Sequence, residues 1–182
     1  ALSRTEAEEC LSHLITEEEH LAWDPRSQSV SAREQRRLGE IILQSRPMKK
    51  VPLHLQTAAL LEGIRQLGLG CLPWDKEATG LRQRLAFLHG HDAAWPDMSD
   101  TGLVDSLEDW LAPYLNGLSR IDQLKTLNLT EILTSRLDWN RQREMDRLAP
   151  SHMAVPSGHR HRIDYSDPQA PVLPVKLQEM FG

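Results

Sequence analysis

Apolar residues near the start of the chain recur at the spacing of a helix face. They occupy positions i, i+3, i+4, i+7 and i+8, and are Ala7, Cys10, Leu11, Leu14 and Ile15. Ser3 and Glu6 have the spacing of a capping box just before them. The pattern predicts an amphipathic first helix, with the Cys10 thiol on its buried face.

The following part of the chain changes to the alternating pattern of β-strands. Apolar residues from Leu21 onward alternate with polar or small neighbours, and the Asp-Pro-Arg-Ser run at 24–27 has turn chemistry. Residues 33–43 fit a helix or a strand by propensity alone. The β-branched pair within them and the stop at Pro47 favour strands. We therefore expect strands over residues 18–46.

Helical spacing returns at Pro52 and continues to Pro150. Helix starts are indicated by Pro52, Asp75, Asp100 and Ser119, and helix ends by Gly68, Gly90, Gly117 and Pro150. Apolar positions from Leu129 to Leu148 predict one longer helix or a broken pair. The short connections between these segments are typical of a compact helical bundle.

The tail returns to alternation. Strands are expected at 153–155, 159–165 and 172–177, with turns at 156–158 and 166–168. The fold class is therefore α+β: a layer of about five helices lies between two short strand-bearing segments that could share one sheet. By composition the chain divides into an accessory segment at 1–50, a helical bundle at 51–150 and a strand segment at 151–182.

The composition is that of an ordinary globular protein. Of the 182 residues, 40% are hydrophobic and 26% charged, and no run approaches the ~18 consecutive apolar residues of a membrane span. Two cysteines, Cys10 and Cys71, predict buried reduced thiols and a cytoplasmic location. The start at Ala1 has neither an initiator Met nor a signal sequence, so the chain reads as a piece of a longer protein.

Charge is distributed unevenly along the chain. Residues 1–20 carry six glutamates against Arg4, whereas residues 26–50 carry seven bases against Glu34 and Glu40. A basic band inside an acidic protein points to phosphate-bearing partners such as nucleic acid. A solvated face paired with the acidic first helix explains the same band equally well, and the sequence leaves both explanations open.

Motifs for independent catalysis are missing from the sequence. A phosphate-binding loop requires a Gly-Lys dipeptide, and the chain contains none. The Glu-Glu-Glu-His run at 17–20 superficially resembles a helicase box, but it follows a predicted helix and reads as a solvated helix end. His152, His159 and His161 fall short of a zinc ligand set. We expect no catalytic residue and no metal site.

The five tryptophans raise the question of base stacking. Trp110 lies in a helical apolar stripe, and Trp74 and Trp95 stand beside prolines in loops between helices. Most of the tryptophans are therefore expected in the core.

Short distinctive runs are spread along nearly the whole chain. They include Gly68-Leu69-Gly70-Cys71-Leu72-Pro73-Trp74 and Trp110-Leu111-Ala112-Pro113-Tyr114-Leu115. The runs at the end of the chain are the most specific, and they include Val155-Pro156-Ser157-Gly158, Ile163-Asp164-Tyr165-Ser166 and Leu177-Gln178-Glu179-Met180-Phe181-Gly182. None of these runs is a catalytic motif, but in their order and spacing the chain resembles the C-terminal region of the HrpB family, bacterial DEAH-type ATP-dependent helicases.

The resemblance implies a longer polypeptide that couples ATP hydrolysis to RNA remodelling. Its two RecA-like motor domains would precede this chain and would hold ATP and Mg, so no cofactor is expected here and no ATP-contacting residue is carried over. The implied partners are RNA and the chain's own N-terminal helicase core, with no membrane.

Two hypotheses about the role of this region remain. The first is an accessory domain that contacts nucleic acid through the basic band and the tail, using Arg33, Arg36, Arg37, Arg46, Lys49, Lys50, Arg160 and Arg162. The second is a structural or protein-interaction domain that packs on the motor or recruits a partner. Charge reversal at the first three arginines should abolish RNA binding only under the first hypothesis.

Overall fold

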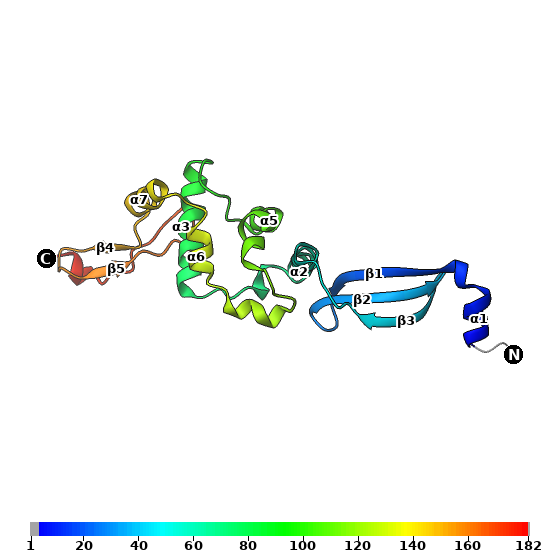
Figure 1. The fold of residues 1–182 in the computed structure, drawn as a ribbon. Helices are drawn as coiled ribbons and strands as arrows, with labels where there is room; N and C mark the ends of the chain where they lie inside the picture. The colour runs from blue at the N-terminus through cyan, green and yellow to red at the C-terminus, as the bar shows by residue number, and fades with distance from the viewer. Residues whose placement is uncertain (1–3, 182) are drawn as a thin grey trace. The chain divides into compact units, whose positions relative to one another are not determined.

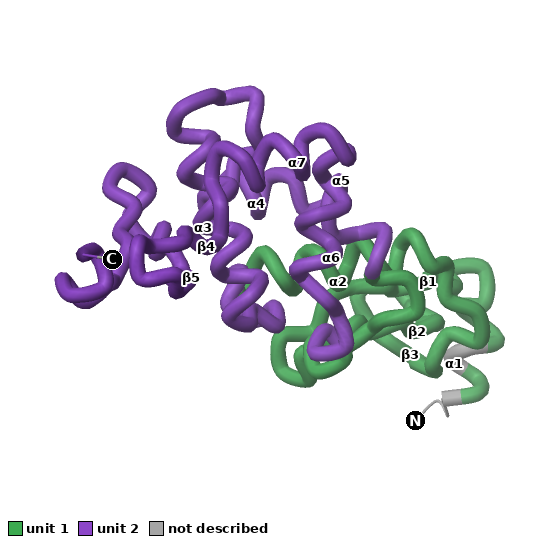
Figure 2. Tube along the Cα trace, turned by 90° about the vertical axis from the view of Figure 1, so that its left-hand side faces the viewer, with its two compact units in different colours: residues 1–67, 115–123 green, residues 68–114, 124–182 purple. Residues whose placement is uncertain are grey.

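The computed structural model describes residues 4–181 and divides them into two compact units. The first contains the described residues up to Leu67 together with Leu115–Gln123, and the second contains Gly68–Tyr114 and Leu124 onward (Figure 2). The division expected from composition, at residues 50 and 150, stays a prediction. None of the described helices is long and apolar enough to cross a membrane.

The first unit is a three-stranded antiparallel sheet with one long helix. It begins with α1 (Arg4–Cys10) and a 3-10 turn, followed by β1 (Ile15–Asp24), β2 (Ser29–Leu38), β3 (Ile41–Pro47) and α2 (Leu53–Leu67) (Figure 1). The strands pair in the order β1-β2-β3. The turn between β1 and β2 is held by the Asp24 carboxylate, which accepts bonds from Ser27 Oγ at 2.7 Å and Arg26 N at 3.0 Å.

Helix α2 packs on the end of this sheet nearest the β1–β2 turn. A Cβ added at Gly63 would overlap the Trp23 ring, so the indole lies directly on the helix backbone. The 115–123 segment completes the unit, because Val30 N donates to Ser119 O at 2.7 Å and Gln56 Nε2 donates to Leu118 O at 2.9 Å. The opposite end of the sheet lies beyond these contacts.

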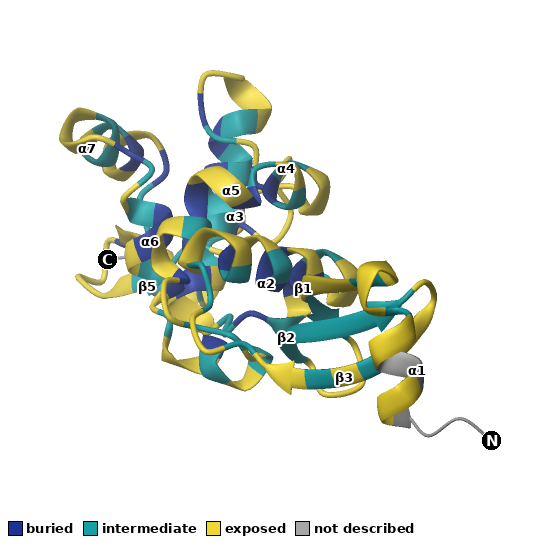
Figure 3. Ribbon diagram, turned by 45° about the vertical axis from the view of Figure 1, so that its right-hand side comes forward, coloured by how far each residue is buried: buried dark blue, intermediate teal, exposed yellow. Residues whose placement is uncertain are grey.

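The second unit is built from short helices and a small hairpin. Its elements are α3 (Lys76–His91), α4 (Asp100–Asp105), α5 (Leu107–Trp110), α6 (Leu129–Thr134), α7 (Trp139–Leu148), β4 (His152–Ala154) and β5 (Arg160–Arg162). Its core is leucine-rich, and Leu85, Leu103, Leu107 and Leu133 are fully buried. Figure 3 shows buried residues in the helices, whereas β1, β2 and β3 contain only half-buried and exposed positions.

The α+β class, the strands of residues 18–46 and several helix boundaries are confirmed. Asp75 caps α3 by accepting a bond from Ala78 N at 2.7 Å, and α2 ends at Leu67, directly before Gly68. The segment from Leu129 to Leu148 is the broken pair α6 and α7. Strong local signals at these positions agree with the tertiary packing, which is the condition under which sequence patterns succeed.

The suggestion that the two strand segments share a sheet is wrong. The tail strands β4 and β5 pair with each other and form a separate two-stranded sheet. Their turn contains Gly158 at φ 86°, a left-handed conformation that glycine adopts without strain. Closing so short a loop costs less chain entropy than pairing with a distant segment. The strand expected at 172–177 is reduced to an isolated bridge between Val172 and Asp164.

The first helix is shorter than its apolar pattern predicts. It ends at Cys10, and Ile15 already belongs to β1, where it is directly opposite Leu38. Pairing with β2 therefore overrides the helical spacing at this point. Cys10 is exposed instead of buried, whereas Cys71 is half-buried, and burial raises the pKa of the Cys71 thiol. The expected cap at Ser3 lies outside the described residues.

Three helix boundaries also differ from expectation. Ser99, one residue before Asp100, caps α4 by accepting a bond from Gly102 N at 3.0 Å, and the helix breaks at Ser106. The segment after Ser119 forms a 3-10 helix at Ile121–Thr126. Helix α3 continues through Gly90 to His91. These are shifts of a few residues at helix ends, where local and tertiary preferences compete.

Candidate nucleic-acid interface

Strand alternation divides the arginines of the basic band between two faces of the β1–β3 sheet. The register from Ile15↔Leu38 to Asp24↔Ser29 is uninterrupted, so successive β2 side chains point to opposite faces. Arg36 and its cross-strand neighbours occupy one face, and Arg33 and Arg37 occupy the other. The band is continuous in sequence but is not a single track in the structure.

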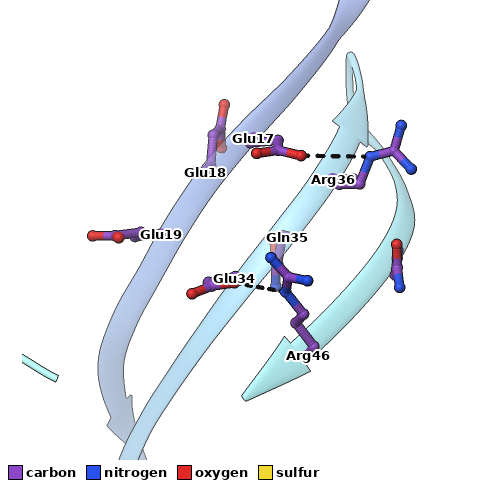
Figure 4. A pocket seen from close by; sticks show the side chains of 8 residues that line it. Glu17, Glu18, Glu19, Glu34, Gln35, Arg36 and Arg46 are labelled. Carbon is purple, nitrogen blue, oxygen red and sulfur yellow. Dashed lines mark hydrogen bonds and ion pairs between the residues drawn. The ribbon is translucent and has the colours of Figure 1, made fainter. Parts of the chain in front are cut away.

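On the first face, each arginine has a carboxylate partner. Arg36 Nε lies 3.8 Å from Glu17 Oε1, and Arg46 Nε lies 2.6 Å from Glu34 Oε2 (Figure 4). They border a groove of about 640 Å³ lined by Glu17, Glu18, Glu19, Glu34, Gln35, Arg36, Gln44 and Arg46. The side chains on this face are three carboxylates, from Glu17, Glu19 and Glu34, and two guanidinium groups, so the face carries a formal charge of −1 and does not attract phosphate.

On the second face, the arginines are also engaged. Arg33 donates from Nε to Ser45 Oγ at 2.6 Å and from Nη2 to Ser45 O at 3.0 Å. Arg37 lies 3.7 Å from Glu18 and 3.5 Å from Glu40. Partly exposed pairs at these distances are weak, worth about 0–1 kcal/mol each. Their main effect is to neutralise the arginines locally.

The remaining four predicted residues are held differently from one another. Lys49 and Lys50 follow β3 and are exposed, and so is Arg160 on β5. Within the described part of the chain, none of these three lies within ion-pair distance of a carboxylate. Arg162, by contrast, lies against Gly80 of α3, 3.4 Å from Lys76 O and 3.7 Å from Glu77. All eight assignments stay predictions, but only Lys49, Lys50 and Arg160 remain free for phosphate.

The Glu-Glu-Glu-His run lies inside β1 and not at a helix end. Its side chains alternate, so Glu17 and Glu19 share one face while Glu18 and His20 share the other. In the tail, His161 Nε2 lies against Glu179 Oε2. Among the described residues, no three His, Cys, Asp or Glu side chains are grouped to hold a metal ion.

The shifted pKa values of two aspartates have local structural causes. The Ser27 hydroxyl and the Arg26 amide lower the pKa of Asp24, and the Ser99 amide and hydroxyl lower that of Asp97. Both carboxylates therefore stabilise turns or helix starts. Arg136 is half-buried near Asp97 and Asp109, and burial lowers its pKa. None of these groups is placed as a general acid or base.

Two of the five tryptophans are buried in the core, Trp23 and Trp74 are half-buried, and one is exposed, so the expectation that most lie in the core is met only in part. Trp95 is 3% exposed and Trp110 is 2% exposed, whereas Trp139 at the start of α7 is 64% exposed. Sequence reasoning did not select Trp139. The available signal was its helical spacing from two later arginines, Arg143 and Arg147, on a helix rich in polar residues.

Comparisons with known proteins agree with these elements. A model described as the ATP-dependent RNA helicase HrpB connector region matches residues 14–48, and one described as ATP-dependent helicase C-terminal matches residues 110–182. The first match coincides with the β1–β3 sheet, and the second includes α6, α7 and the β4–β5 hairpin. The chain is therefore similar to the connector and C-terminal regions of ATP-dependent helicases.

A related sequence and a related structure agree with these two matches. The chain is 34% identical over 173 residues to the ATP-dependent RNA helicase HrpB of Escherichia coli K12, covering 93% of this chain and 21% of that protein. A crystal structure of the E. coli DExH-box NTPase HrpB aligns with TM-score 0.67 and 32% identity over 99% of this chain and 22% of that one. The chain corresponds to the C-terminal region of HrpB, and it spans about a fifth of the length of the curated relative that it matches.

A second crystal structure, titled as that of the E. coli DEAH/RHA helicase HrpB, gives the same picture. It aligns with TM-score 0.67 and 33% identity, covering 92% of this chain and 22% of the other. The resemblance seen in the sequence is therefore confirmed at the level of both sequence and fold.

Proposed function

We propose that this chain is a non-catalytic accessory region of an ATP-dependent RNA helicase and that it contacts RNA beside the motor domains. The observation that carries the proposal is the paired match of the connector and C-terminal family models to an HrpB-like chain. Under this proposal, ATP and Mg bind in the preceding part of the longer polypeptide, where hydrolysis takes place.

RNA contact is supported by the free cations of the chain. Lys49, Lys50 and Arg160 are exposed and, within the described residues, lack carboxylate partners. Such side chains gain by releasing counterions from a phosphate backbone, and this gives binding a steep salt dependence. The paired arginines of the sheet support the proposal less, because an incoming phosphate must first displace a carboxylate.

A second candidate function is packing on the helicase core or recruitment of a protein partner. It is favoured by exposed apolar side chains at the end of the chain, where Leu177 is 74% exposed and Phe181 is 73% exposed. Ile41, at the tip of the β2–β3 hairpin, is 62% exposed. Large apolar side chains in such positions are typical of surfaces that another protein covers.

The two candidates are separated by binding of the 182-residue chain to fluorescent single-stranded and duplex RNA across a salt series. We expect binding at about micromolar concentration, weakening steeply with salt, and no ATP hydrolysis above background. Absence of binding at low salt would remove the RNA role and favour packing on the core. Hydrolysis by the purified chain would contradict its non-catalytic character.

A further inference from the structure

Helix α7 carries an aromatic and two arginines along one side. Trp139, Arg143 and Arg147 are four residues apart and therefore lie on one face, rising ~6 Å from each to the next. Trp139 is 64% exposed, and both arginines are exposed. We call these three residues the α7 stripe.

The other charged residues of α7 are engaged in holding the helix in place. Asp146 accepts a bond from Arg84 Nη2 at 2.8 Å, and the Arg141 guanidinium lies 4.6 Å from the centre of the Trp95 ring. Arg141 also lies 3.8 Å from Glu144. Met145 is buried in the core. The burial of Met145 and the Arg141–Trp95 contact fix which side of α7 faces the fold and leave the α7 stripe exposed to solvent.

The cations of the stripe are unpaired. Within the described residues, neither Arg143 nor Arg147 lies within ion-pair distance of a carboxylate, and the Arg143 guanidinium lies over the Trp139 ring, 4.6 Å from its centre. Beside the stripe, Asn140, Arg143, Glu144 and Arg147 line an open hollow of about 450 Å³. This arrangement differs from that of the sheet, where every arginine has a partner.

The exposure of Trp139 is costly for the fold. A cation–π contact at an exposed site contributes ~0.5–1 kcal/mol, whereas burying a large apolar side chain contributes ~1.5–3 kcal/mol. The Arg143 contact therefore does not compensate for leaving the indole in water. A ligand that covers the ring would recover this free energy on binding.

We propose that the α7 stripe binds single-stranded RNA, with an unpaired base stacked on Trp139 and with Arg143 and Arg147 contacting the backbone phosphates. Exposed aromatics beside free cations are the combination that single-strand binding uses, and it is tolerant of sequence because every base has a π-face. The inference rests on the proposed function and deepens it by assigning an RNA contact that lies outside the eight residues selected from the sequence.

The test compares matched variants of the 182-residue chain by fluorescence anisotropy with labelled single-stranded RNA. Trp139→Ala removes the stacking surface, and Arg143→Gln with Arg147→Gln removes two charges. Lys125→Gln with Lys176→Gln removes two charges from exposed positions outside α7 and serves as the control. Circular dichroism and thermal unfolding verify that each variant is folded.

We expect Trp139→Ala to weaken single-stranded RNA binding by roughly 5- to 150-fold, the range for loss of one stacked base. Duplex RNA should be affected less, because its bases are already stacked. The double glutamine variant should also weaken binding, and the lysine control should change it much less. Trp139→Phe keeps a ring and should retain most of the affinity.

A spectroscopic readout keeps the proposal falsifiable if the alanine variant unfolds. RNA should quench part of the tryptophan emission of the unmodified chain, and this part should be absent in Trp139→Phe. DNA of the same sequence, used as a second ligand, shows whether the ribose contributes.

The outcomes distinguish the inference from the proposed function. If the unmodified chain binds no RNA, both fall together. If it binds RNA and both α7 variants bind as tightly as the lysine control, only the α7 assignment is overturned. Unchanged RNA binding together with loss of affinity for the purified helicase core would assign the stripe to a protein partner instead, because exposed Trp and Arg are also frequent hot spots of protein interfaces.

Discussion

The β1–β3 sheet and helix α7 are both rich in arginine, but they hold their arginines in different ways. In the sheet, Arg36, Arg37 and Arg46 face glutamates on the neighbouring strands, and Arg33 is bonded to Ser45. On α7, Arg143 and Arg147 have no carboxylate partner among the described residues. The comparison shows that a cationic surface is available to phosphate when its basic side chains lack carboxylate partners. The number of basic residues matters less.

The two regions also differ in how they are anchored to a core. No position of the three strands is buried, whereas α7 inserts Met145, which is 5% exposed. The sheet depends on cross-strand pairing and on its contact with α2. Helix α7 is anchored to the leucine-rich core of the second unit.

The largest effect is expected at the anchor of α7. Met145→Ala removes a buried side chain and leaves a cavity, which should lower the free energy of unfolding by ~2–5 kcal/mol. RNA affinity should fall with it, since the stripe loses its support. Ile42→Ala at the sheet's hairpin tip removes a side chain that is 49% exposed and should change stability by less than ~0.5 kcal/mol. Urea denaturation compares the two, and equal losses would contradict the difference in anchoring.

The attachment of the sheet to α2 should be sensitive to a single methyl group. Gly63→Ala places a Cβ where the Trp23 ring lies, so the ring or the helix must shift. Overpacking of this kind should cost ~1–3 kcal/mol. The same substitution at Gly70, where no atom lies within 4 Å of the added Cβ, is the matched control. Thermal unfolding should give a lower melting temperature for Gly63→Ala than for Gly70→Ala. Similar melting temperatures would show that the contact between Gly63 and Trp23 accommodates an added methyl group.

Neutralising glutamates of the sheet should release arginines from their carboxylate partners, so that they resemble the arginines of α7. Glu17→Gln, Glu18→Gln and Glu34→Gln together free Arg36 and Arg46 and remove one of the two partners of Arg37, which should raise RNA affinity severalfold at low salt. The triple control Glu9→Gln, Asp105→Asn and Glu131→Gln changes the net charge equally at exposed sites whose side chains have no ion-pair partner among the residues that the structure describes. An equal gain in both triples would mean that net charge, and not pairing, controls binding.

The smallest effect is expected at the β1–β2 turn. Hydrogen bonds from Ser27 and Arg26 lower the pKa of Asp24 below its ordinary value of 3.8. A carboxylate whose pKa is lower in the folded state stabilises that state at neutral pH, and the contribution disappears as the pH falls through the folded pKa. NMR titration of the Asp24 side chain should give a midpoint below 3.8, and Ser27→Ala should raise it. An unchanged midpoint in that variant would exclude Ser27 as the cause.

The parts of the fold predictable from sequence were those with strong local signals. Alternation and the Asp-Pro-Arg-Ser turn located the first hairpin, and Asp75 and Gly68 located helix boundaries. The choice of strand partners was not predictable, because an alternating pattern marks a strand without specifying its partner. The two tail strands paired with each other. The exposure of Cys10 was also missed, since pairing of β1 with β2 ended the helix that would have buried it.

The candidate site was predictable only in part, for a related reason. The sequence gives the order of Arg33, Arg36 and Arg37 but not the register that places glutamates opposite them. The helical spacing of Trp139, Arg143 and Arg147 is visible in the sequence. Which side of that helix faces solvent, however, depends on the burial of Met145 and on the contact of Arg141 with the Trp95 ring, which joins segments far apart in the chain.

The most direct test of the account is the salt dependence of single-stranded RNA binding in two charge-matched variants. For single strands, the logarithm of the binding constant falls with the logarithm of salt with a slope of about −0.7 per phosphate contact. Arg143→Gln with Arg147→Gln should therefore flatten the slope by about 1.4, whereas Arg36→Gln with Arg37→Gln should leave it nearly unchanged. A flattened slope in the sheet variant and an unchanged slope in the α7 variant would contradict the account and return the RNA contact to the basic band.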